Sequence, residues 1–161
     1  MTISPFPRRS SRRVPRKGNP VAEQFDGTGV RARIVALIAA HNEEVSIGAA
    51  LESLAVQGRR PDEVIVVADR CTDRTAEIAA SYGAKVFETL DNGHRKAGAL
   101  NQALVSVLAD LKPTDQVLLM DADTILSEGF VGSAESRLNS RDAGRSPVGA
   151  VGGVFFAHDR R

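Results

Sequence analysis

Three continuous apolar runs constrain the fold of this chain more than any other feature of its sequence. They occupy residues 33–40, 63–68 and 117–120. Short continuous runs, rather than alternating ones, are typical of strands that are buried on both faces of a parallel sheet. Residues 85–88 predict a further short strand, and the apolar, glycine-containing residues 148–156 predict a fifth.

Helical patterns fill the intervals between these strands. Ile47, Leu51 and Leu54 repeat at i, i+4 and i+7, which gives one apolar face, and Asn42 is the expected N-cap. Thr72 or Asp73 is expected to cap the second helix. The helices are predicted at residues 42–58, 72–82, 94–110 and 127–138. Alternation of strands and helices predicts an α/β fold of the Rossmann-like type, with a mostly parallel sheet and helices on both faces.

Composition and charge divide the chain into two parts. The 161 residues are 42% hydrophobic and 25% charged, as in a globular domain with a real core. Residues 1–33 hold eight Lys or Arg and two acids, whereas residues 34–161 hold thirteen basic and eighteen acidic residues. We therefore expect a basic arm at residues 1–30 and a domain at residues 31–161.

The arm contains four prolines and no apolar periodicity, so it is expected to be disordered. A solvated tail without a partner is the favoured interpretation. Weak contact with an anionic membrane surface is the alternative, at about 1 kcal/mol per basic residue. Nucleic acid is not an expected partner, because no aromatic residue interleaves the charges. With a single cysteine and no signal-peptide pattern, we expect a cytoplasmic protein, membrane-peripheral if the arm binds lipid.

Polar side chains follow the strands at the points where the strands end. His41 follows the first strand, Asp69 the second, and Asp121 and Asp123 the fourth. Ligands collect at the carboxyl ends of strands in open α/β sheets. Asp-x-Asp alone is more often a turn or a cap. At this edge, however, its hard oxygens suit Mg²⁺ or Mn²⁺ carrying a phosphate.

Two of these positions leave their alternatives open. His41 either belongs to the start of the helix or lines a base-binding pocket. Arg95 and Lys96 open a helix at the end where the macrodipole disfavours cations. They indicate an anionic partner such as a diphosphate, or they are a pair of solvated charges.

Taken in order, four motifs resemble the N-terminal, nucleotide-sugar half of family 2 glycosyltransferases with the GT-A fold. They are Ala-His-Asn-Glu-Glu at 40–44, Val-Val-Ala-Asp-Arg-Cys-Thr-Asp-Arg-Thr at 66–75, Arg-Lys-Ala-Gly-Ala-Leu-Asn at 95–101 and Met-Asp-Ala-Asp at 120–123. The resemblance spans residues 33–156. The amino-acid sequences of residues 96–101 and 121–124 are most similar to those of the processive polysaccharide synthase branch.

The resemblance implies a UDP-sugar donor and a Mn²⁺ or Mg²⁺ cofactor. Ala39 and His41 would wall the uracil pocket, and Asp69 would hydrogen-bond the base. Glu43 would belong to the same nucleotide-sugar site. Lys96 would lie near the diphosphate.

Asp121 would lie near the ribose or the metal, and Asp123 would ligate the metal. The family usually has Pro where Ala39 stands and often an acid where Ala68 stands. The chain shows neither the Gln-x-x-Arg-Trp motif nor an identifiable general base, so no catalytic residue is assigned and the domain is expected to stop before the acceptor half.

Two functions therefore stay open. The first is an inverting, metal-dependent glycosyltransferase, or its donor-binding fragment. The second is a non-catalytic nucleotide-sugar and metal-binding module that another chain completes. A dinucleotide site and a P-loop are not expected, because neither glycine pattern is present. Apolar surface around residues 148–156 predicts self-association or marginal stability.

Overall fold

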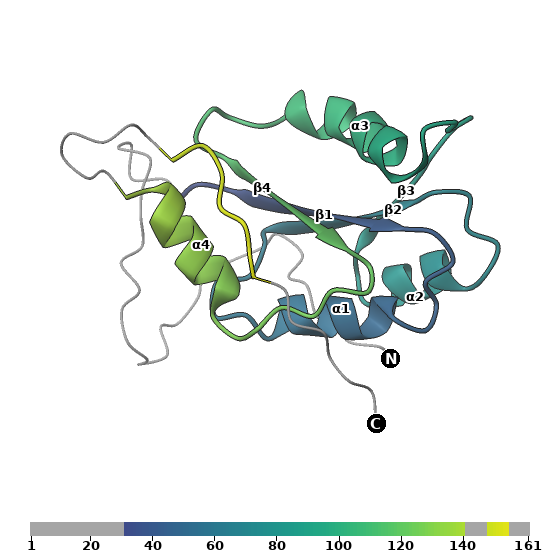
Figure 1. Ribbon diagram of the computed structural model, residues 1–161, viewed down its shortest axis with the longest axis horizontal. Coiled ribbons are helices and arrows are strands. Elements are labelled where there is room, and N and C mark those ends of the chain that lie inside the picture. The colour runs from purple at the N-terminus through teal and green to yellow at the C-terminus, as the bar shows by residue number, and fades with distance from the viewer. Residues whose placement is uncertain (1–30, 141–147, 155–161) are drawn as a thin grey trace.

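The computed structural model describes residues 31–140 and 148–154 (Figure 1). The predicted basic arm lies outside these ranges. Strands and helices alternate along the described chain. Their bounds are β1 Ile34–Ala40, α1 Ile47–Ala55, β2 Glu63–Ala68, α2 Thr75–Ser81, β3 Lys85–Glu88, α3 Arg95–Leu108, β4 Gln116–Asp121 and α4 Phe130–Leu138.

The four strands form one sheet in the order β3-β2-β1-β4, and every pair is parallel. The chain first adds β2 and β3 on one side of β1, and then crosses to the other side for β4. Strand order therefore reverses between β1 and β4, where Ala39 pairs with Asp121. The carboxyl ends of two such strands flank the crevice in which open α/β sheets bind ligands. The predicted α/β, Rossmann-like fold is confirmed.

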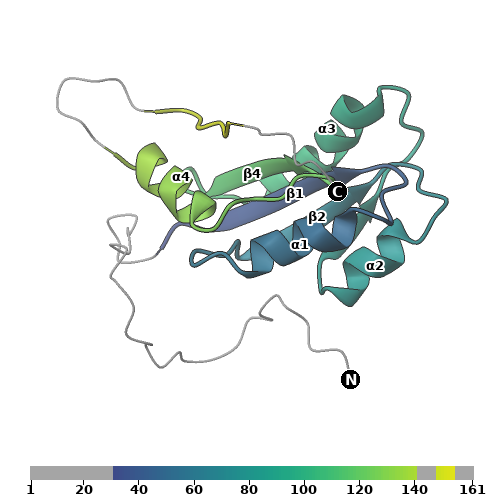
Figure 2. The ribbon, with the colours of Figure 1, turned by 60° about the horizontal axis from the view of Figure 1, so that its bottom comes forward.

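Helices cover both faces of the sheet (Figures 1 and 2). Ile34, Ala36 and Ile38 of β1 pack in a core with residues of α1, α2 and α4. Val35 and Leu37 face the opposite way and pack with buried alanines of α3. A strand that is covered on both faces needs apolar side chains at every position, which explains the continuous run in the sequence.

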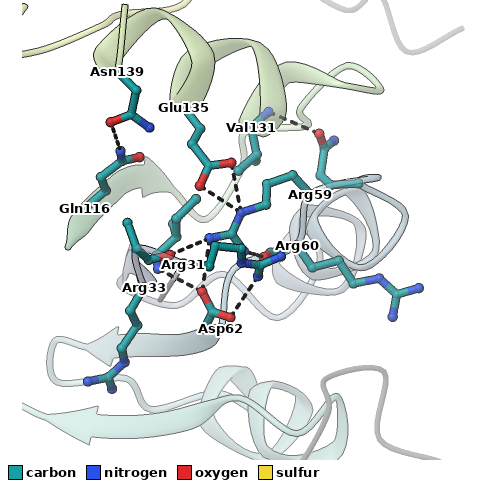
Figure 3. A network of polar contacts seen from close by, with 12 residues as sticks. Arg31, Arg33, Arg59, Arg60, Asp62, Gln116, Val131, Glu135 and Asn139 are labelled. Atoms are coloured by element: carbon teal, nitrogen blue, oxygen red, sulfur yellow. Dashed lines mark hydrogen bonds and ion pairs between the residues drawn. The ribbon is translucent and has the colours of Figure 1, made fainter. Parts of the chain in front are cut away.

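A polar network fastens α4 to the amino-terminal edge of the sheet (Figure 3). Arg59 Nε donates to both carboxylate oxygens of Glu135 in α4, at 3.1 and 3.0 Å. Arg59 Nη2 donates to the carbonyl oxygen of Ala32 at 2.9 Å and to Asp62 Oδ2 at 3.2 Å. The side chains of Arg59 and Glu135 are only 7% and 11% exposed, so this is a largely buried ion pair.

The predicted cap of α2 is wrong, because Arg74 is at its N-cap position and not Thr72 or Asp73. Two further predicted helix starts are wrong. Helix α1 begins at Ile47 and not at Asn42, whose φ of 54° places it in the left-handed region. Helix α4 begins at Phe130 after Gly129, which has a φ of 77°, and Ser127 contributes only its carbonyl oxygen to Phe130 N. In both cases the chain makes an additional turn before it enters the helix, which a cap-type residue in the sequence does not reveal.

The predicted fifth strand is also wrong over its described part. Residues 148–154 form no strand, and Val154 is 83% exposed. Three glycines at 149, 152 and 153 weaken strand pairing, because glycine loses more backbone entropy than other residues. Residues 155 and 156 lie outside the described ranges. Self-association through this apolar segment stays a prediction. Among the helices that are described, none is long and apolar enough to cross a membrane.

Candidate functional site

A pocket of about 450 Å³ opens at the carboxyl ends of β1, β2 and β4, beside the start of α3. All seven residues singled out from the sequence line it. Arg95, which the sequence indicated with Lys96 as a partner of an anion, lines it as well. Four further lining residues were not predicted: Ala40, Arg70, Ala99 and Ala122. The full lining is Ala39, Ala40, His41, Glu43, Asp69, Arg70, Arg95, Lys96, Ala99, Asp121, Ala122 and Asp123.

His41 and Asp69 are joined at one end of the pocket. His41 Nδ1 lies 2.6 Å from the carbonyl oxygen of Asp69. Because a carbonyl oxygen only accepts, Nδ1 of His41 carries a proton and donates this hydrogen bond. Asp69 N donates in turn to the carbonyl oxygen of Ala40 at 2.9 Å. These two contacts fix the end of β1 against the end of β2.

The carboxylate of Asp69 is almost buried, with the residue 6% exposed. Burial alone would raise the pKa of this group. Hydrogen bonds from Asn92 and Thr89, together with the charges of Arg70 and His41, outweigh the burial and hold the pKa below its ordinary value. The bond from Thr89 Oγ1 to Asp69 Oδ1 measures 2.8 Å. Asp69 is therefore an ionised hydrogen-bond acceptor at neutral pH.

Hydrogen bonds join the loop after β1 to the loop after β2. Asn42 Oδ1 accepts from Thr72 N at 2.8 Å and lies 3.3 Å from Thr72 Oγ1. Glu43 N donates to Thr75 Oγ1 at 2.8 Å. Asparagine tolerates the left-handed backbone at position 42 better than most residues, which turns its side chain toward the second loop.

Asp73 makes the third connection. Its Oδ2 accepts from Glu44 N at 3.0 Å, while its Oδ1 accepts from Thr75 N at 3.0 Å and from Thr75 Oγ1 at 2.5 Å. Glu44 Oε2 accepts from Arg74 N at 3.2 Å. Residues that the sequence presented as helix caps thus hold two loops together, and these loops carry His41 and Asp69.

Charged groups meet at the other part of the pocket, where β4 ends and α3 begins. Lys96 Nζ donates to Asp121 Oδ1, and the two side chains are 55% and 49% exposed. Asp123 is exposed, and its carboxylate has no hydrogen bond or ion pair with any residue in the described ranges. It is therefore available to a ligand.

The donor atoms at this end fit an ion such as Mg²⁺ or Mn²⁺. Within residues 31–140 and 148–154, no group of three or more His, Cys, Asp and Glu is arranged to hold a metal. Asp121 and Asp123 supply hard carboxylate oxygens but too few ligands for a closed structural site such as that of zinc. Mg²⁺ commonly binds through one or two carboxylates and takes its remaining ligands from water and substrate phosphates.

Two buried polar residues of α1 and its C-terminal turn hold the segment that follows the Asp-x-Asp motif. Ser53 Oγ accepts from Leu126 N at 3.1 Å, and Gln57 Nε2 donates to the carbonyl oxygen of Ser127 at 2.9 Å. Gln57 is 2% exposed, so its own side chain is shielded from water. The chain around Asp123 is thereby fixed on one side by β4 and on the other by these contacts.

These features define a Rossmann-like α/β domain with a charged pocket at its topological switch point. The chain belongs to glycosyl transferase family 2, because the family model matches residues 35–144. The 4,4'-diaponeurosporenoate glycosyltransferases of Staphylococcus aureus strains bovine RF122 / ET3-1 and USA300 are 37% identical to it over 87 residues. That match covers 54% of this chain and 23% of each relative.

Solved structures of the GT-A type share the fold. Mycobacterium tuberculosis glucosyl-3-phosphoglycerate synthase in complex with Mn²⁺, UDP and glucosyl-3-phosphoglycerate superposes with a TM-score of 0.54 at 23% identity, covering 77% of this chain and 45% of the synthase. A mycobacterial protein gives a TM-score of 0.58 at 27% identity, covering 80% of this chain and 43% of that protein. The chain thus spans less than half the length of these structures and about a quarter of the curated relatives.

Proposed function

We propose that the pocket binds a UDP-sugar together with Mn²⁺ or Mg²⁺, as the donor side of an inverting glycosyltransferase. The observation that carries the proposal is the convergence of seven residues on one pocket. Six of them come from four motifs that lie far apart in the sequence, and the seventh, Ala39, directly precedes the first motif. The pocket lies where the strand order reverses. Neither the fold nor any single motif would be sufficient, because many unrelated ligands bind to sheets of this kind.

The base would lie against the two joined loops. The ionised carboxylate of Asp69 would accept a hydrogen bond from the uracil imide, and such charge-assisted bonds are stronger than neutral ones. Ala39 and His41 would form the wall of this part of the pocket, with Glu43 beside them. The bonds between the loops hold these groups in place before the nucleotide arrives, which lowers the entropic cost of binding.

The diphosphate would lie between Lys96 and the two aspartates. Lys96 would pair with phosphate oxygens, Asp123 would ligate the divalent ion, and Asp121 would contact the ion or the ribose. When it is bound, such an ion neutralises charge that develops on a departing diphosphate. The acceptor also has to lose a proton, and none of the pocket residues is assigned as the base for that step.

Two comparisons support this proposal. The M. tuberculosis synthase has been crystallised with UDP and either Mn²⁺ or Mg²⁺. The curated relatives are named glycosyltransferases, which favours a transferase over the non-catalytic module. We also propose a similarity to processive polysaccharide synthases in particular, and the amino-acid sequence of residues 96–101 and 121–124 is our only reason for it.

Calorimetric titration of UDP with and without Mn²⁺ tests the proposal. We expect the wild-type chain to bind UDP more tightly with Mn²⁺ than without it. In Asp123→Ala, the UDP affinity measured with Mn²⁺ should fall by about tenfold or more, because even residues that only contact the ligands of a metal contribute that much to its binding. Asp110→Ala is the matched control, because Asp110 is an exposed carboxylate just beyond the far end of α3. Absence of UDP binding with and without Mn²⁺ would refute the proposal.

A further inference from the structure

We propose that Lys96 is an internal counterion of the metal site. In the ligand-free chain its ammonium group neutralises Asp121, and the arriving diphosphate draws it away, so that nucleotide binding frees Asp121 for the divalent ion. This inference deepens the proposed function and rests on it for the identity of the two ligands. It assigns to Lys96 a role in the order and coupling of binding, in addition to contact with phosphate.

The contact between Lys96 and Asp121 joins two elements that are distant in the sequence. Lys96 is the second residue of α3, and Asp121 is the last residue of β4. The macrodipole disfavours a cation at the start of a helix, so the ammonium group depends on a nearby anion. Both side chains are about half exposed, and lysine has a long, flexible stem. The ammonium group can therefore move from one anion to another at little cost.

Of the lysine and arginine side chains that line the pocket, Lys96 is the one that forms an ion pair with Asp121 in the described part of the chain. Arg70 Nε lies 3.9 Å from Asp69 Oδ1, at the other end of the site. Arg95 has no ion pair with any residue for which the structure gives a position. The carboxylates of Asp121 and Asp123 together carry two negative charges. When Lys96 is in contact with Asp121, the net charge of the three groups is one negative charge. A divalent ion gains correspondingly less by binding there.

The ammonium group and a metal ion compete for the same carboxylate, that of Asp121. Two cations held at one carboxylate would lie only a few ångströms apart, where like charges repel each other even when solvent screens them. A diphosphate resolves the competition, because it offers Lys96 another anion and offers the metal further oxygens. Linkage then requires that nucleotide raises the affinity for metal by the same factor as metal raises the affinity for nucleotide.

The expected size of the effect follows from the exposure of the pair. Partly exposed ion pairs contribute modestly, so removal of the ammonium group should tighten binding of the metal alone by roughly two- to fivefold. The same change should weaken binding of metal-free UDP, because the diphosphate loses its lysine. A single substitution is thus expected to move two affinities in opposite directions.

The experiment compares Lys96→Met with the wild-type chain. Mn²⁺ alone is titrated in the absence of nucleotide, with the electron paramagnetic resonance signal of free Mn²⁺ as the readout. UDP is titrated separately by calorimetry in the presence of a chelator. We expect tighter Mn²⁺ binding and weaker UDP binding in Lys96→Met, whereas Lys96→Arg, which preserves the pair, should behave as wild type. Misfolding cannot produce the gain in Mn²⁺ affinity.

Arg95→Met is the charge-matched control, because it removes the same charge from the adjacent residue. It should change Mn²⁺ affinity less than Lys96→Met does. An unchanged Mn²⁺ affinity in Lys96→Met, or an equal gain in Arg95→Met, would overturn the counterion role. Unchanged UDP affinity in Lys96→Met would overturn the transfer of Lys96 to the diphosphate. If Lys96→Met gains Mn²⁺ affinity while the wild type binds no UDP, the counterion role is supported and the nucleotide site is refuted.

Discussion

Replacement of Thr75 by valine tests whether the joined loops position the base end of the pocket. Thr75 is fully buried at the start of α2. Its hydroxyl accepts a hydrogen bond from Glu43 N at 2.8 Å and donates one to Asp73 Oδ1 at 2.5 Å. Valine has nearly the same shape but no hydroxyl, so the substitution removes both bonds and leaves no cavity.

The two partners are affected unequally. Asp73 keeps hydrogen bonds from Thr75 N and Glu44 N, both at 3.0 Å, so its carboxylate retains partners. Glu43 N loses its acceptor in a partly buried hydrogen bond, and an N–H that is left without a partner away from water costs about 1–3 kcal/mol. The loop can recover part of that cost by moving toward water, and this movement would carry His41 and Glu43 away from the pocket. We therefore expect a loss of about 1–3 kcal/mol in stability and a drop of about tenfold in UDP affinity.

Urea denaturation and UDP titration of the same samples measure the two effects. Thr75→Ser is the matched control, since it keeps the hydroxyl and loses one methyl group, at about 0.8 kcal/mol. It should be less stable than wild type and yet bind UDP normally. If Thr75→Val binds UDP with wild-type affinity, the loops do not position the base. Equal weakening in both variants would assign the effect to packing.

Two further predictions concern stability. Arg59→Met should lower the free energy of unfolding by about 3 kcal/mol or more, because it leaves the nearly buried Glu135 carboxylate unpaired, and adding Glu135→Gln should restore part of the loss in denaturant titrations. The lowered pKa of Asp69 means that its ionised form stabilises the fold above its unfolded pKa of about 3.9, and that this contribution is lost as the pH falls through the lower folded pKa. Asp69→Asn should therefore remove part of the acid dependence of stability below about pH 4, measured by denaturation at a series of pH values.

The sequence was sufficient to predict the four strands and the edge of the sheet that carries the site. A run such as residues 34–38 is apolar at every position, and only a strand covered on both faces can bury it. Parallel strands bring their carboxyl ends to one edge, so the residues after β1, β2 and β4 had to meet there. His41, Asp69 and Asp121 do line one pocket at this edge, although no side-chain contact was known from the sequence, and their binding roles stay predictions.

The supports of the site could not be predicted in the same way. Asn42, Thr72 and Asp73 are residues that cap helices, and the sequence offered no sign that they would instead bond across two loops. Gln57 and Arg59 carry no periodic signal, because their partners Ser127 and Glu135 lie 70 and 76 residues away. One local sign of such distant partners exists: a polar residue that is buried in the last turn of a helix or just after it. A buried polar group needs a hydrogen-bond partner, and that partner can lie far away in the sequence.

The two ends of the pocket are supported by separate sets of contacts. Bonds between the loops support the base end, whereas Ser53 and Gln57 support the segment after Asp123. Because the two sets share no residue, changes in them should be nearly additive. Thr75→Val should thus weaken metal-free UDP binding and leave the relative gain from Mn²⁺ intact, while Gln57→Met should do the reverse. A common loss of both quantities in either variant would show that the pocket is stabilised as one unit, and that its base and metal ends cannot be treated as independent parts.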